Sequence, residues 1–418
     1  MNSIIADSMA LTLRMLRRSR LRTFLSVVGI AIGIASIIVI MSAGLSLRKI
    51  FDAQLAAFGT DYIQIEIKVP NTGKNSTSNG AGIAQGISVT TLTLDDKRKV
   101  DNLGNVRASY AAVLGQSIVT SLYDEKRVNY MAVSSEFPRI DTTGLKSGQF
   151  FSDEDERGLA KVVVLGSDAA KKLFPGQDPL GQSIKVQKQS FRVVGVMNAR
   201  GSTGFVSLDD WIFVPLRTAQ KLLLGFDHVS MIFAQLKDVS QDIDTAADIT
   251  AVLRAQHDIT DPAKDDFAVT TQAESQGLVG TILSGITLVL GIIASIALLV
   301  GGVGIMNIMY VAVNERVFEI GLRKAVGARV THIKTQFLVE AIVITLIGGI
   351  FGLIMAAVMI LAVYGIANAS GFDWPFAISV PSIAGSIFFS SLIGLTFGYY
   401  PAKRASELRP VEALAHHG

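Results

Sequence analysis

Four long apolar segments place the strongest constraint on how this chain can fold. They lie near residues 23–46, 279–312, 336–365 and 378–400. Each is long enough to cross the hydrocarbon core of a bilayer, which takes roughly 20 apolar helical residues. Half of the 418 residues are hydrophobic and 17% are charged, too apolar for a soluble protein and too charged for a bundle buried wholly in lipid. The sequence therefore predicts an α-helical membrane protein with four transmembrane helices and a separate polar domain.

The polar domain is expected between the first and second spans, over residues 47–278. Residues 62–67 alternate apolar and polar side chains, as a half-buried strand requires. Further strands are expected near 117–123, 162–165, 183–186, 191–197, 212–214, 231–236 and 267–271. Helices are expected near 92–101, 167–173, 216–223 and 243–256, and a loop or turn-rich hairpin over 68–91. We therefore predict a large α+β domain, long enough for two subdomains with separate cores.

Basic residues outside the polar domain predict the orientation in the membrane. The 13 that flank the spans are Arg14, Arg17, Arg18, Arg20, Arg22, Arg316, Arg323, Lys324, Arg329, Lys334, Lys403, Arg404 and Arg409. The connector between the last two spans, residues 366–377, has none. Because cytoplasmic loops carry the excess of basic residues, segments 1–22, 313–335 and 401–418 are expected in the cytoplasm. The polar domain and the 366–377 loop are then outside.

The first span is interpreted as a retained anchor rather than a cleaved signal peptide. Its apolar run exceeds the roughly 7–15 residues of a signal core, and no A-x-A cleavage site follows it. Ile5, Met9, Leu13 and Leu16 recur at helical spacing beside basic residues. This pattern predicts that residues 1–22 form an amphipathic helix in the cytoplasmic interface.

The connector between the second and third spans, residues 313–335, is basic and has helical signals. Glu319 lies four residues before Arg323, the favourable order for a helical ion pair. Gly327 follows Arg323 and Lys324, where a helix would end with cations at its negative pole. A stiff charged helix here favours a docking surface, and an ordinary basic cytoplasmic loop is the alternative.

Each span contains small residues four positions apart. The pairs are Gly29 and Gly33, Gly291 and Ser295, Gly348 and Gly352, and Gly394 and Gly398. Such spacing lets helix backbones approach closely in lipid. The pattern by itself is compatible with packing inside the bundle and with dimerisation.

The residues that carry catalytic chemistry are scarce. The chain has no cysteine, and His228 and His257 are the only histidines of the polar domain. The acidic run 153–156 is interpreted as a solvated turn, since the spaced ligands and glycine of a calcium loop are missing. No GxxxxGK[ST] motif occurs, and the domain is nearly neutral, with 28 acidic and 25 basic residues over 47–275. We therefore expect no catalysis, no bound metal or cofactor, and no nucleic-acid partner.

Several ordered motifs resemble the MacB-type permeases of ABC transporters, a superfamily that includes the lipoprotein-release permeases LolC and LolE and the division protein FtsX. The helical motifs are Gly301–Met309, Glu315-Arg316, Glu319–Gly321, Arg323–Arg329, Pro401–Ala405 and Arg409–Leu414. In the polar domain they are Phe150-Phe151, Val162–Gly166, Leu173–Pro175, Asp178–Gln182 and Phe191–Val196. The resemblance covers nearly the whole chain.

The resemblance implies a permease of the bacterial inner membrane that works as a homodimer or heterodimer with two copies of a separate cytoplasmic ABC ATPase. ATP and Mg²⁺ would be bound by that ATPase. The polar domain would be a periplasmic core domain, moved by mechanotransmission during export. A periplasmic membrane-fusion adaptor and an outer-membrane channel are further expected partners. The coupling residues would be Glu315, Arg316, Glu319, Ile320, Arg323, Lys324, Gly327, Ala328 and Arg329.

Two other functions are open within the same resemblance. An FtsX-like protein would regulate an envelope hydrolase, and a LolC- or LolE-like permease would release lipoproteins. An ion-coupled secondary transporter fits poorly, because the spans lack an ionisable pathway and paired repeats.

Overall fold

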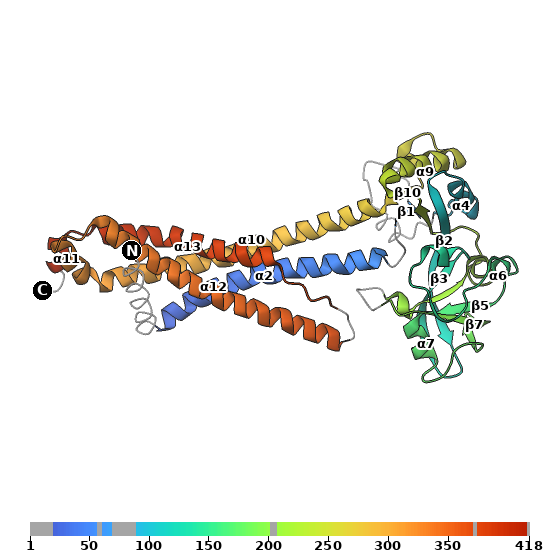
Figure 1. Ribbon diagram of the computed structural model, residues 1–418, viewed down its shortest axis with the longest axis horizontal. Coiled ribbons are helices and arrows are strands. Elements are labelled where there is room, and N and C mark those ends of the chain that lie inside the picture. The colour runs from blue at the N-terminus through green and yellow to red at the C-terminus, as the bar shows by residue number, and fades with distance from the viewer. Residues whose placement is uncertain (1–19, 57–60, 69–88, 201–206, 371–373, 416–418) are drawn as a thin grey trace. The chain divides into compact units, whose positions relative to one another are not determined.

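The computed structural model describes residues 20–56, 61–68, 89–200, 207–370 and 374–415 (Figure 1). It divides into two compact units. One is helical and includes the described residues up to 49, 281–370 and 374 onward; the other is an α/β unit that covers 50–280. The interfacial helix predicted over 1–22 and the loop predicted over 68–91 lie almost entirely outside the described residues.

Four helices form the body of the helical unit. They are α2 (Arg20–Ala56), α10 (Gln272–Glu315), α12 (Val330–Ala369) and α13 (Val380–Glu407). Each contains a stretch that is long and apolar enough to cross a membrane, so the predicted set of four spanning helices is confirmed. The helices extend past the apolar runs at several ends: α10 begins at Gln272, and α13 continues to Glu407. Two short helices complete the unit, α11 (Val317–Ala325) and α14 (Pro410–Ala415).

The helical unit has one hydrophobic core to which all four long helices contribute. Ile34 of α2, Ile305 of α10 and Phe337 of α12 are almost completely buried in it. Ile393 and Ala402 add the contribution of α13. Because the outward faces of the same helices carry exposed leucine, isoleucine and valine side chains, lipid is the environment that they suit.

The α/β unit is built on one ten-stranded mixed sheet. Its strands are β1 (Tyr62–Ile67), β2 (Val106–Thr120), β3 (Glu125–Val133), β4 (Leu145–Gly148), β5 (Val162–Leu165), β6 (Ser183–Val186), β7 (Gln189–Met197), β8 (Ile212–Pro215), β9 (Met231–Leu236) and β10 (Phe267–Thr271). Their order is β10-β1-β9-β2-β3-β8-β5-β7-β4, with β6 paired to β2 and β7. The β3–β8 and β5–β7 pairs are parallel and the others antiparallel.

Helices cover the sheet at both ends (Figure 1). They are α4 (Leu94–Asp101), α5 (Phe137–Ile140), α6 (Asp153–Arg157), α7 (Ser167–Leu173), α8 (Leu216–Ala219) and α9 (Asp242–Gln256). Local sequence explains the start of two of them. Thr93 with Asp96 forms a capping box before α4, and Ser152 with Asp155 forms one before α6. A π-helical turn, Gln220–Leu224, continues α8 to Gly225, whose φ of 76° closes it.

The two hydrophobic clusters of this unit line the two faces of the sheet. On β5, Val163 and Leu165 belong to one cluster while Val162 and Val164 belong to the other. The larger cluster also reaches Ile249 of α9, at the other end of the sheet. We predicted two subdomains with separate cores, but the structure has one sheet with a hydrophobic cluster on each face. The cores separate by face because alternate side chains of continuous strands point to opposite sides.

Most of the predicted strands and helices of the domain are confirmed within a few residues. Two strands were missed, β3 and β4, and β2 begins at Val106 instead of near residue 117. The acidic run 153–156 was predicted as a solvated turn, which is wrong: it forms α6. The capping box at Ser152 starts this helix, and Glu156 is buried with 5% of its surface exposed.

Candidate functional site

The predicted basic connector folds as α11, a nine-residue amphipathic helix between two long helices. The chain leaves the α10 conformation at Arg316, with φ −112° and ψ 14°, and α11 begins at the next residue. Ile320 and Gly321 face the bundle and are buried. Phe318 and Leu322, on the other side, are 45% and 51% exposed. The helix therefore has one face anchored in the unit and one face presented to its surroundings.

An ion pair fixes the start of α11 to α12. The Nη1 atom of Arg316 lies 3.3 Å from Oε1 of Glu340, whose side chain is only 2% exposed. The Nε atom of Arg316 also lies 3.9 Å from a carboxylate oxygen of Glu319. Breaking one partner of a buried pair leaves an uncompensated charge. The break between α10 and α11 is thus tied to the next long helix.

A second set of contacts holds the end of α11. Arg323 pairs with Glu319 at 2.6 Å, which confirms the predicted helical ion pair, and donates to Oε1 of Gln336 on α12 at 2.9 Å. Lys324 donates to the carbonyl oxygen of Leu408, which precedes α14, at 2.7 Å. Gly327 adopts φ 96°, a conformation that favours glycine, and the chain enters α12 at Val330. The helix is held at both ends.

Three apolar side chains lie on the exposed side of this segment. Phe318 and Leu322 of α11 and Val326, the residue that follows α11, recur every four residues and are 45%, 51% and 82% exposed. We call these three residues the apolar ridge. Contiguous exposed apolar surface on an ordered element marks a contact with protein or membrane. The ridge gives the basic connector an apolar centre, as specific protein interfaces have.

The predicted coupling residues divide by burial. Glu315, Arg323, Gly327 and Arg329 are exposed, and Arg316, Glu319, Lys324 and Ala328 are partly buried. Ile320 was predicted to take part in docking, but only 3% of it is exposed and it packs in the bundle core. We reassign Ile320 to holding α11 on the bundle, because a buried side chain cannot meet a partner. The apolar ridge was missed, although its spacing in the sequence marks the face opposite Ile320.

The structure assigns three of the four predicted small-residue pairs to packing inside the bundle. A Cβ atom built on Gly29, Gly33, Gly348, Gly352, Gly394 or Gly398 would lie within 3.3 Å of a neighbouring helix. These six glycines allow close packing inside the bundle. Among the described residues, nothing lies within 4 Å of a Cβ built on Gly291, and the exposed Ser295 donates to the backbone oxygen of Gly291 of its own helix.

Two packing glycines were not predicted in this role. A Cβ on Gly301 would lie 2.9 Å from the backbone nitrogen of Ile30, and one on Gly302 would lie 2.5 Å from the ring of Phe397. Gly301 and Gly302 therefore serve helix packing. The spacing of Gly301 from Gly29 along the chain gives no sign of this contact.

The polar clusters of the α/β unit are structural in character. Arg200 and Asp141 form a 2.8 Å ion pair with side chains 8% and 2% exposed. His257 lies between Asp266 and Asp96, with ring nitrogens 2.8 Å and 3.3 Å from their carboxylate oxygens. Among the described residues, no group of three or more His, Cys, Asp or Glu side chains is arranged to hold a metal ion.

The fold and the anchored connector define a class: membrane proteins with an α/β domain inserted between the first and second of four spanning helices. Residues 23–252 match the family model described as MacB-like periplasmic core domain, and residues 291–410 match FtsX-like permease C-terminal. The chain belongs to the MacB-type permease family.

Relatives with assigned names agree with this membership. The macrolide export ATP-binding/permease protein MacB of Bdellovibrio bacteriovorus is 31% identical over 96% of this chain, and that of Azoarcus sp. is 34% identical over 99%. The pyoverdine export ATP-binding/permease protein PvdT of Pseudomonas entomophila is 33% identical over 95%. The chain spans 57–60% of the length of these relatives. The periplasmic region of MacB from Actinobacillus actinomycetemcomitans aligns at a TM-score of 0.44 with 19% identity, over 57% of this chain and 97% of that one.

Proposed function

We propose that this chain is the permease part of an ATP-driven export system and that α11 is its coupling helix. The observation that carries the proposal is an amphipathic helix held at both ends, with an apolar ridge along its exposed side. In this proposal the ridge seats in a groove of an ABC ATPase, whose own chain binds ATP and Mg²⁺. Two permease copies, identical or different, act with two ATPases, and this chain is not itself catalytic.

The anchors of α11 supply the physical reason for mechanical coupling. A shift of the ATPase applied at the ridge reaches α12 through the Arg316–Glu340 and Arg323–Gln336 contacts. Because these bonds join α11 to a 40-residue helix, the movement passes to the spans instead of being absorbed by a flexible loop. The inserted domain then moves on the outer side of the inner membrane and drives the exported molecule, with an adaptor and an outer-membrane channel as its further partners. The basic residues on α11 and beside the spans support the cytoplasmic placement of this helix.

The inserted domain favours export over the two alternative functions, envelope-hydrolase regulation and lipoprotein release. The FtsX-like match covers only residues 291–410, whereas the MacB-like match covers most of the inserted domain and the first span. Named relatives that match nearly the whole chain are export proteins for macrolides and pyoverdine. We therefore prefer export to envelope-hydrolase regulation and to lipoprotein release as the proposed function.

The test is reconstitution of the chain with its ABC ATPase in nanodiscs and measurement of the ATP hydrolysis that the permease stimulates. Leu322→Glu places a charge in the ridge and is expected to reduce stimulation by about tenfold, the effect of removing one interface anchor. Leu122→Glu is the matched control, since Leu122 is 82% exposed in the inserted domain and should leave stimulation unchanged. Equal stimulation by both variants contradicts the assignment of α11.

A further inference from the structure

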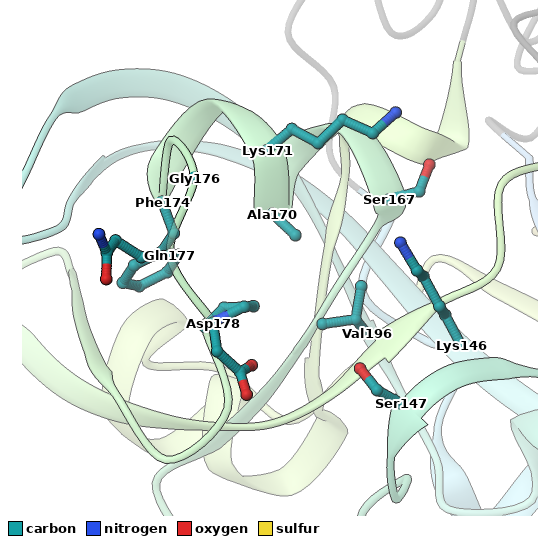
Figure 2. Close-up of a pocket in the computed structure, with 11 residues that line it drawn as sticks. Lys146, Ser147, Ser167, Ala170, Lys171, Phe174, Gly176, Gln177, Asp178 and Val196 are labelled. Carbon is teal, nitrogen blue, oxygen red and sulfur yellow. The ribbon is translucent and has the colours of Figure 1, made fainter.

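A hollow of about 370 Å³ opens on the inserted domain beside α7 (Figure 2). Its walls come from three parts of the chain. Lys146 and Ser147 of β4 form one side, Ser167 and Lys171 of α7 form another, and the turn 174–179 after α7 forms the third. The φ of 71° at Gly176 lets this turn reverse direction. Nothing in the proposed coupling role uses this hollow.

The floor of the hollow is apolar and fixed. Phe174, Ala170 and Val196 line it and are 1%, 7% and 4% exposed. All three belong to the large core cluster, so the floor cannot collapse or rearrange without disturbing the sheet. Such a surface suits the apolar body of a small molecule.

Two ammonium groups stand at one end of the hollow. Figure 2 shows the side chains of Lys146 and Lys171 reaching toward the end where Ser167 lies. Lys171 pairs with Asp168 at 2.8 Å and is 68% exposed, while no ion pair of Lys146 occurs among the residues that the structure describes. Positive charge at this end is therefore only partly neutralised, and it favours a negatively charged group.

A hydroxyl at the same end lacks a hydrogen-bond partner within the part of the chain that the structure describes. Ser167 is 5% exposed, and its Oγ atom is buried without such a partner. Buried hydroxyls without a partner cost free energy and are uncommon in folded proteins. Because this oxygen is buried in the structure, a change of its χ1 rotamer is required before the hydroxyl can donate to an acceptor in the hollow.

The opposite side of the hollow has the opposite charge. In Figure 2 the Asp178 carboxylate lies across Val196 from the two lysines. One of its oxygens accepts from the Leu180 backbone N–H at 3.0 Å, which holds the carboxylate in place. A molecule with negative charge at both ends would be repelled here, so the arrangement selects a single anionic end.

We propose that this hollow binds a small organic anion with one carboxylate end and an apolar body. The carboxylate lies between Lys146 and Lys171 and accepts from the hydroxyl of Ser167. The apolar body lies on Phe174, Ala170 and Val196, directed toward Asp178. The site is separate from the coupling helix, so its test does not depend on the proposed export role.

The experiment uses the full chain in lipid nanodiscs and 4-phenylbutyrate as the probe, with 4-phenylbutanol and 4-phenylbutylamine as neutral and cationic counterparts. Ligand-observed NMR measures affinity, and acetylation of lysines followed by mass spectrometry locates the site. We expect the acid to bind more tightly than either counterpart and to protect Lys146. Lys172, which pairs with Asp210 outside this hollow, should remain as reactive as before.

Variants separate a built site from general surface charge. Replacing both lysines by alanine is expected to weaken binding by about tenfold, and Ser167→Ala by roughly threefold. Lys172→Ala removes one positive charge from the helix that carries Lys171 and should leave the affinity unchanged. Thermal unfolding of each variant verifies that the domain remains folded.

Three results would overturn the proposal. They are equal binding of the acid and the alcohol, equal loss in Lys172→Ala and the double variant, or no protection of Lys146. Binding of a peptide through its C-terminal carboxylate, without binding of the small acid, would assign the hollow to a protein partner instead.

Discussion

At the residue scale, burial changes the behaviour of individual acids in the inserted domain. Glu156 belongs to the acidic run that forms α6, and its Oε2 accepts from the backbone N–H of Ser135 at 2.7 Å. Burial raises the pKa of Glu156, because the charged carboxylate loses hydration, and the bond from Ser135 only partly opposes this. The folded domain therefore holds a proton on this side chain more tightly than the unfolded chain does.

Glu156→Gln is expected to remove a pH dependence of stability. A carboxyl group whose pKa is higher in the folded state contributes fully to folding stability at pH values below its ordinary pKa. This contribution is lost as the pH rises through the raised pKa. At neutral pH the variant should unfold at a higher temperature than the unmodified chain, and the difference should vanish in acid. Glu154→Gln, on the exposed side of α6, is the control. Thermal unfolding across a pH series measures both, and a variant destabilised at neutral pH would contradict the expectation.

At the element scale, close packing of the long helices depends on particular glycines. A Cβ on Gly352 of α12 would lie 2.7 Å from the backbone oxygen of Ala31 on α2. Backbone cannot move aside as a flexible side chain can. A Cβ on Gly291 of α10 has no described residue within 4 Å. Identical four-residue patterns thus have different structural roles.

Gly352→Val is expected to destabilise the helical unit by about 1–3 kcal/mol, the usual cost of overpacking. Gly291→Val should leave the isolated chain as stable as before, because no described residue lies near its Cβ position. Thermal unfolding in detergent, at low protein concentration, compares the two. Greater damage at Gly291 would show that this face of α10 packs against a helix that the single chain does not supply.

At the scale of the whole molecule, the prediction concerns which side of the membrane each unit occupies. The chain has no cysteine, so single cysteines can be labelled without background. Val326 of the apolar ridge and Leu122 of the inserted domain are both 82% exposed, which makes them a matched pair. In spheroplasts, an impermeant maleimide is expected to label Leu122→Cys at once and Val326→Cys only after permeabilisation. Labelling of position 326 in intact spheroplasts would contradict the proposed orientation.

The sequence alone was sufficient for features whose causes are local. Apolar runs predicted the four spanning helices, and the alternation of residues 62–67 predicted β1. The pairing of Glu319 with Arg323 and the end of α11 before Gly327 follow from spacings of four residues or fewer. Such features depend on backbone geometry within one or two turns, which the order of residues already specifies.

Tertiary structure decided every feature that joins distant parts of the chain. Arg316 meets Glu340 across 24 positions and Lys324 meets Leu408 across 84, and neither spacing follows a local period. Packing also decided which glycines contact another helix and which do not. It buried Glu156, and it brought β4 beside α7 to form the hollow. These outcomes depend on which faces of helices and strands pack together, and that pairing is set only when the whole chain folds.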